Sequence, residues 1–191
     1  MPSGEEVEFV FDAYDELARL LLFDLPALAL VLHLMAKKSA KAADALRGPG
    51  PRDGALAFAV FLALALVATA SGAAASLFPD SGSAGYLERP FGAAAWITAF
   101  LSCAATGYLE EAYFRAYLPE SFDEAGVPPP RAMIASTVLF AVCHLYEGPW
   151  GVLNACLAGG ILSAAYLYRK SVHAPAWAHA AYNFFVYATA P

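Results

Sequence analysis

The stretch GALAFAVFLALALVATASGAAASLFP, residues 54–79, decides the fold class, because none of its 26 residues carries a charge. A helix needs about 20 apolar residues to cross a hydrocarbon layer of about 30 Å. The 20 residues that follow Arg89 and the 21 residues that precede Arg169 are equally free of charge. Backbone polar groups in lipid must be satisfied within the chain itself, so these stretches predict an all-α, multi-pass transmembrane helical bundle.

The composition of the whole chain agrees with a membrane protein. Of 191 residues, 60% are hydrophobic and 15% are charged, whereas soluble domains have about 45–50% apolar and about 25% charged residues. The net charge of −6 leaves no basic surface to neutralise phosphates, which argues against nucleic-acid binding. The three cysteines lie inside apolar runs, where they are expected to be small hydrophobic side chains rather than disulfide partners.

The positions of the charged residues predict about six membrane helices in a single membrane-embedded domain, residues 1–191. The first helix is interrupted by Asp24 and Pro26, and the fourth is short enough to form a re-entrant pair with the fifth. Pieces rich in glycine, proline and serine at 48–54 and 79–90 are expected to be connecting loops. The predicted helices cover residues 17–36, 54–78, 91–118, 131–146, 149–168 and 174–190.

Basic residues set the expected orientation, because loops rich in lysine and arginine stay in the cytoplasm. The loop 37–53 holds five of the eleven basic residues, and the first sixteen residues hold six acids and no base. Loops 37–53, 119–130 and 169–173 are therefore expected in the cytoplasm, with both termini outside and the protein in the cell membrane. Loop 119–130 is itself acidic, which does not follow the rule.

Three clusters of polar residues interrupt the apolar helices within residues 91–190, which we take as the catalytic core. They are EEAYFR at 110–115, FAVCH at 140–144 and HAAYN at 179–183. A charge at the centre of a bilayer costs roughly 2.5–3.5 kcal/mol, so such residues are candidates for function. Residues four apart project from one face of a helix. The first and third clusters therefore each present two polar side chains on a common face.

A helical rise of about 1.5 Å per residue tests whether these clusters can meet. Measured from the expected cytoplasmic helix ends, Glu110 lies about 12 Å deep, His179 about 9 Å and Asn183 about 15 Å. His144 lies about 20 Å deep, a mismatch of roughly one and a half turns that helix tilt can absorb. The clusters are therefore expected to converge on one cavity that faces the cytoplasm.

Two chemical schemes fit a buried carboxylate beside two imidazoles. In the first, Glu110 takes a proton from water, the water attacks a carbonyl carbon, and histidine and asparagine donate hydrogen bonds to the oxyanion. In the second, Glu110, His144 and His179 bind zinc and leave one position for water. Both schemes hydrolyse a peptide bond, and the residues alone leave both open.

The order EExxxR, FxxxH and HxxxN, each on its own membrane helix, resembles the CPBP intramembrane proteases over residues 91–190. That group includes the type II CAAX prenyl endopeptidases and bacterial bacteriocin-processing and immunity proteins. The resemblance implies an endopeptidase, often labelled a metalloprotease with zinc as the metal, whose substrate is a membrane-associated or lipidated protein, prenylated proteins included. A metal-free glutamate mechanism has also been proposed for the group.

The resemblance also assigns roles to individual residues. Glu110 is implied as the base that activates water, and His144 either assists it or binds metal. His179 and Asn183 are implied at the oxyanion or the metal, while Glu111 and Arg115 are implied to hold the helix ends in register. The candidate set is five catalytic residues and two supporting residues: Glu110, Glu111, His144, His179 and Asn183, with Arg115 and Phe140.

Each of these assignments has a simpler alternative. Glu111 and Arg115 can form a purely structural ion pair, Glu110 can extend to the membrane interface, and either histidine can be an ordinary core residue. Rival functions are a serine intramembrane protease built on Ser71, a proton-coupled transporter, and a non-catalytic membrane or immunity partner. Ser71 has no supporting motif, and a transporter would usually show broken helices in symmetric halves, which the sequence lacks.

Overall fold

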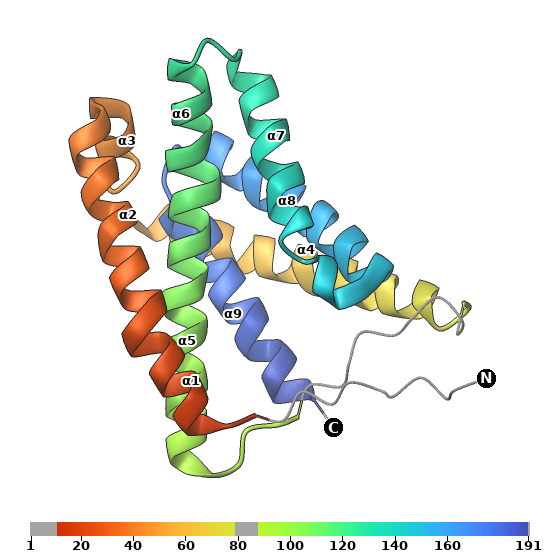
Figure 1. Cartoon of the computed structure of the whole chain (residues 1–191). Helices are drawn as coiled ribbons and strands as arrows, with labels where there is room; N and C mark the ends of the chain where they lie inside the picture. The colour runs from red at the N-terminus through yellow and green to blue at the C-terminus, as the bar shows by residue number, and fades with distance from the viewer. Residues whose placement is uncertain (1–10, 79–87, 191) are drawn as a thin grey trace.

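The computed structural model describes residues 11–78 and 88–190, and every regular element within these ranges is a helix (Figure 1). The predicted all-α class is therefore confirmed. Most of the predicted loop 79–90 lies outside the described residues, as do three of the N-terminal acids that contributed to the expected orientation, Glu5, Glu6 and Glu8.

Four helical segments are long and apolar enough to cross a membrane: Ala13–Lys38, Pro51–Ala75, Gly92–Glu124 and Leu145–Arg169. Two shorter helices, α7 (Pro129–Val142) and α9 (His173–Thr189), occupy the predicted fourth and sixth spans. With 14 residues, α7 is about 21 Å long at 1.5 Å per residue. It is therefore shorter than a hydrocarbon layer of about 30 Å. This arrangement agrees with about six spans.

The first membrane segment is continuous, although the sequence predicts an interruption at Asp24. It consists of α1 (Ala13–Arg19), a π-helical turn η1 (Leu20–Asp24) and α2 (Leu25–Lys38). Pro26, which has no N–H to donate, comes directly after η1, where the Leu25 N–H bonds to Leu20 O and the regular i to i−4 pattern is already interrupted. The wider turn of η1 directs Asp24 into the protein, and only 1% of its surface is exposed.

The second membrane segment, α4 (Pro51–Ala75), is fixed at its start by Asp53. Asp53 Oδ2 accepts a hydrogen bond from the Gly50 N–H at 2.8 Å, which satisfies a backbone donor at the helix start. Its Oδ1 accepts a second bond from Arg169 Nε at 2.9 Å. Because Arg169 ends α8 (Gly148–Arg169), this ion pair ties the start of α4 to the end of α8.

The candidate core begins with one long rod made of α5 (Gly92–Glu111), a second π-helical segment η3 (Ala112–Tyr117) and α6 (Leu118–Glu124). Figure 1 shows this rod in green beside α7, which returns from its tip. A short 3-10 turn, η4 (Leu145–Glu147), then joins α7 to α8.

Helix α9 lies between α5 and α4, with its strongest packing against α5 (Figure 1). The two backbones touch at Gly107, where a Cβ atom would lie 3.0 Å from both Ala176 O and Ala180 N. Small residues permit such close helix contacts in membranes. The contact places the middle of α9 directly against the end of α5.

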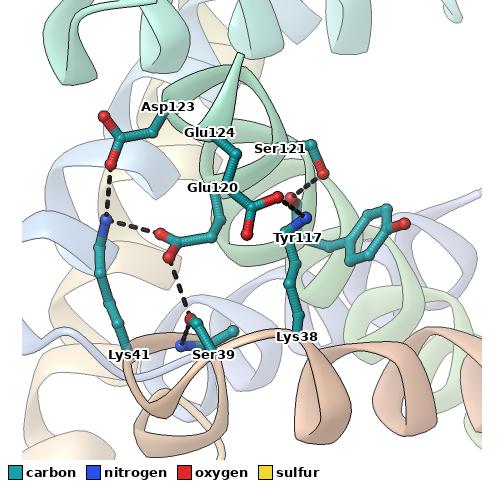
Figure 2. A network of polar contacts seen from close by, with 9 residues as sticks. Lys38, Ser39, Lys41, Tyr117, Glu120, Ser121, Asp123 and Glu124 are labelled. Carbon is teal, nitrogen blue, oxygen red and sulfur yellow. Dashed lines mark hydrogen bonds and ion pairs between the residues drawn. The ribbon is translucent and has the colours of Figure 1, made fainter. Parts of the chain in front are cut away.

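An ion-pair network, which we call the α2–α6 clasp, joins the end of α2 and the short helix α3 (Ala40–Asp44) to α6 (Figure 2). Lys38 Nζ lies 2.5 Å from Glu124 Oε2, and Lys41 Nζ lies 2.6 Å from Glu120 Oε2 and 3.4 Å from Asp123 Oδ2. The hydrogen bond to Glu120 raises the pKa of the Lys41 ammonium. The predicted loop 119–130 was wrong in its first half, because Glu120, Asp123 and Glu124 lie in helix α6. These acids pair with lysines of the basic segment 37–53.

Candidate active site

The centre of the site is a buried contact between α5 and α9. His179 Nδ1 lies 3.0 Å from Glu111 Oε1, and the two residues are 6% and 0% exposed. A carboxylate can only accept a hydrogen bond, so the Nδ1–H of His179 donates to Glu111. In the neutral ring this tautomer leaves the Nε2 lone pair free, and Nε2 lies 3.7 Å from Glu110 Oε2.

The two adjacent glutamates differ in their environment. Glu111 is fully buried, whereas 27% of the Glu110 side chain is exposed. Consecutive residues of a helix point about 100° apart, so only one of the pair can face the accessible side. Glu111 therefore orients the imidazole from behind, and Glu110 is the carboxylate that a substrate or water molecule can reach.

Arg115 lies behind this contact and is fully buried. Its Nε is 3.1 Å from Glu111 Oε2, and its guanidinium lies over the Phe140 ring at 4.7 Å. Within the described residues none of its nitrogens has a hydrogen-bond acceptor, so the attraction to Glu111 is that of an ion pair without hydrogen-bond geometry. The π-helical turn η3 directs Arg115 inward, where its charge compensates that of Glu111.

His144 lies after the end of α7 and is held by Phe140. The structure ends this helix at Val142, so the predicted helical placement of His144 was wrong by two residues. The Nδ1–H of His144 donates to Phe140 O at 2.8 Å, because a carbonyl can only accept, and the neutral ring has its Nε2 lone pair free. Its ring also stacks on Tyr146 with centroids 6.2 Å apart.

Phe140 connects the residues from the three motifs. Its ring centroid lies 4.6 Å from that of His144, 5.9 Å from that of His179, and beneath the Arg115 guanidinium. Glu110 joins this group through His179, whose Nε2 lies 3.7 Å from Glu110 Oε2. Six of the seven predicted residues thus gather around the junction of α5, α7 and α9.

Asn183 is the seventh predicted residue, and it stands apart from these contacts. It lies one turn beyond His179 on α9, is partly exposed, and forms no hydrogen bond with the part of the chain that the structure describes. A side-chain amide that has no internal partner remains available to a substrate. Its role at an oxyanion therefore stays a prediction.

The side chains do not present a ready metal site. Among residues 11–78 and 88–190, no three histidine, cysteine, aspartate or glutamate side chains are gathered closely enough to hold a metal ion. His144 and His179 each donate Nδ1–H to an oxygen acceptor and have Nε2 free, which is also how metal-binding histidines are usually held. Zinc therefore stays a prediction, and we derive no step through a metal.

A second contact that fixes α9 was not predicted from the sequence. The Nε2–H of His173 donates to Arg47 O at 2.6 Å, and its Nδ1 lies 3.0 Å from the Tyr108 hydroxyl, which donates to it. The Arg47 side chain also donates to the backbone oxygens of Arg169 and Lys170 at the end of α8. Arg47 and His173 are 126 residues apart in the sequence, and no motif connects them, so the sequence holds no signal for this support.

Comparison with known proteins supports the same region of the chain. Residues 92–185 match a family model described as Type II CAAX prenyl endopeptidase Rce1-like. The match includes all seven candidate residues and excludes α1 to α4. No curated protein and no solved structure matches the chain.

Proposed function

We propose that this membrane protein hydrolyses a peptide bond in a membrane-associated protein, because residues 92–185 match the Rce1-like family model of type II CAAX prenyl endopeptidases. The observation that carries the proposal is the position of His179 between two glutamates. Glu111 holds its Nδ1 at 3.0 Å, and its Nε2 lies 3.7 Å from the more accessible Glu110.

In the proposed mechanism Glu110 is the general base. A water molecule between Glu110 and the Nε2 lone pair of His179 donates one hydrogen bond to each of them. Glu110 takes the proton as the water oxygen bonds to the carbonyl carbon, and then gives that proton to the leaving amine as the carbon–nitrogen bond breaks. The reaction has no net proton gain or loss, so these side chains supply all the proton transfers it needs.

The tautomer of His179 indicates that another residue donates hydrogen bonds to the oxyanion. Because its Nδ1–H is committed to Glu111, the neutral ring presents an acceptor at Nε2, which suits a water molecule better than an oxyanion. The side-chain N–H groups of Asn183 lie one turn farther along α9 and can donate to the oxyanion. His144, with Nδ1–H bound to Phe140 O, can accept from the attacking water or from the substrate N–H.

The substrate class is proposed from the family. We expect a protein or peptide that is bound to the membrane through a lipid group, with a prenylated cysteine as the first candidate. We also propose that the protein is in the cell membrane with loop 37–53 in the cytoplasm, since five of its eleven basic residues are in that loop.

Cleavage of prenylated peptides by the purified protein in lipid nanodiscs tests the proposal. We expect turnover by the unmodified chain and none by Glu110→Ala, because the base is then missing. Asp15→Asn is the matched control and should retain turnover, because Asp15 is exposed and far from Glu110 in the sequence. Retained turnover in a folded Glu110→Ala protein would refute the assignment. Proton flux into liposomes that Glu110→Gln abolishes, without cleavage, would instead support the transporter.

A further inference from the structure

A second group of buried polar atoms lies where η1 packs against α5, apart from the contacts of Glu110 and Glu111 with His179. Asp24 Oδ2, Ser102 Oγ and Thr106 Oγ1 are buried and have no hydrogen-bond partner among the described residues. Asp24 and Ser102 are 1% and 2% exposed, and the Thr106 hydroxyl lies beside the Asp24 carboxyl. Ser102 precedes Thr106 by one helical turn on the same face of α5. We call these three residues the α1–α5 polar seam.

The nearest cation does not satisfy Asp24. Arg19 Nη1 lies 3.4 Å from Asp24 Oδ2, but the shorter contact of Arg19 is the hydrogen bond from Nη2 to Glu16 Oε2 at 2.6 Å. Asp24 therefore has a positive charge nearby and no hydrogen-bond donor on Oδ2 within the described chain. Neither hydroxyl forms a direct hydrogen bond to the carboxylate among the described residues, so a molecule that both donates and accepts is needed to join the three atoms.

We propose that the α1–α5 polar seam binds ordered internal water. Water donates to the Asp24 carboxylate and accepts from the hydroxyls of Ser102 and Thr106, which satisfies all three unpaired atoms. A buried water molecule typically forms about three hydrogen bonds, as this set provides. A bound metal cation would be repelled by the Arg19 guanidinium, which already lies against the same carboxylate oxygen.

The seam leads toward the candidate site. Thr106 lies one turn before Glu110 on α5, and Asn183 lies one turn beyond His179 on the neighbouring helix α9. Because the apolar interior of a membrane contains little water, hydrolysis there needs a local supply. The seam provides that supply to Glu110, and this second role rests on the proposed function.

Hydroxyl-radical footprinting of the intact protein in nanodiscs tests the bound water directly, because radicals formed in ordered water label the side chains beside it. Cys103 is the native reporter: it is 4% exposed, and it lies on α5 next to Ser102 and three residues before Thr106. We expect Cys103 to be labelled far faster than its exposure predicts. Labelling of Cys103 no faster than that of a dry buried residue would overturn the proposal, whether or not the protein cleaves peptides.

Substitutions in the seam separate its two roles. Thr106→Val should lower the labelling of Cys103 several-fold, while Thr106→Ser should retain it because the hydroxyl remains. Thr189→Val is a matched control, since its hydroxyl is exposed and already bonds to Phe185 O. A melting curve checks folding, and Ser102→Ala replaces Thr106→Val if that protein does not fold.

The supply role predicts a lower kcat with an unchanged KM in Thr106→Val and not in Thr106→Ser. Loss of labelling with unchanged kcat would overturn the supply role and leave the water site. Labelling that does not change in Thr106→Val or Ser102→Ala would place the water elsewhere and overturn the site. If the unmodified chain cleaves no peptide, the proposed function fails, while footprinting still decides the water site.

Discussion

Replacement of Gly107 by alanine tests the packing that assembles the site. A Cβ at this position would lie 3.0 Å from Ala176 O and Ala180 N, and 3.1 Å from Ala180 Cβ, whereas ordinary contacts begin at 3.4 Å. The obstacles are mainly backbone atoms, which cannot rotate away. The two helices must therefore separate by at least about 0.4 Å for the methyl group to fit.

The separation acts on stability and on chemistry together. Overpacking costs about 1–3 kcal/mol, and the better helix propensity of alanine returns up to about 1 kcal/mol of it. Because α9 carries His179, the same movement lengthens its contacts with Glu111 and Glu110, now 3.0 and 3.7 Å. A misplacement of about 1 Å can cost about 10²-fold in rate, so we expect Gly107→Ala to lower kcat by about 10- to 10²-fold.

Steady-state cleavage and thermal unfolding, measured on the same nanodisc preparation, test this expectation. Gly160→Ala is the matched control, because Gly160 lies on α8 and an alanine Cβ there would meet nothing within 4 Å among the described residues. It should unfold at the same or a higher temperature and retain its kcat. Full activity and an unchanged unfolding temperature in Gly107→Ala would refute the argument that backbone contact sets the geometry of the site.

Three further substitutions or treatments have definite expected outcomes. Asn183→Ala should lower kcat by about 10²–10³-fold if it is an oxyanion donor, and full activity would remove Asn183 from the site. Arg115→Met should lower the free energy of unfolding in urea by about 3–5 kcal/mol, because it leaves the buried carboxylate of Glu111 without a compensating charge. The double variant Arg115→Met with Glu111→Gln should recover part of that loss, and no recovery would contradict the ion-pair role. The proposed scheme uses no metal, so dialysis against a chelator should leave cleavage unchanged, and a loss of cleavage that zinc restores would contradict this scheme.

Much of the fold could be predicted from the distribution of charges. The charge-free stretch 54–79 and its two counterparts predict helices, because lipid leaves the backbone no other way to satisfy its polar groups. Helix ends were harder to predict. The sequence shows no break after Val142, but the structure places His144 in the turn beyond it, where the Nδ1–H of His144 bonds to Phe140 O.

Contacts between distant segments were beyond a single sequence. The motifs predict that Glu110 and His179 converge, since each is a costly polar residue at a similar depth. Nothing in the order of residues indicates that η1 directs Asp24 inward or that His173 bonds to Arg47, because both depend on which helices become neighbours. The acids at the start of segment 119–130 form ion pairs with Lys38 and Lys41, and the sequence alone gives no sign of these contacts.

The bonds of Arg47 have a consequence for protein dissection. Its side chain donates hydrogen bonds to backbone oxygens at the end of α8, and its carbonyl accepts a hydrogen bond from His173 at the start of α9. Arg47 nevertheless lies outside the matched family region, residues 92–185. The region that matches the family model therefore depends on contacts from a residue outside it. A fragment limited to the shared region would lose the brace at the turn between its last two helices.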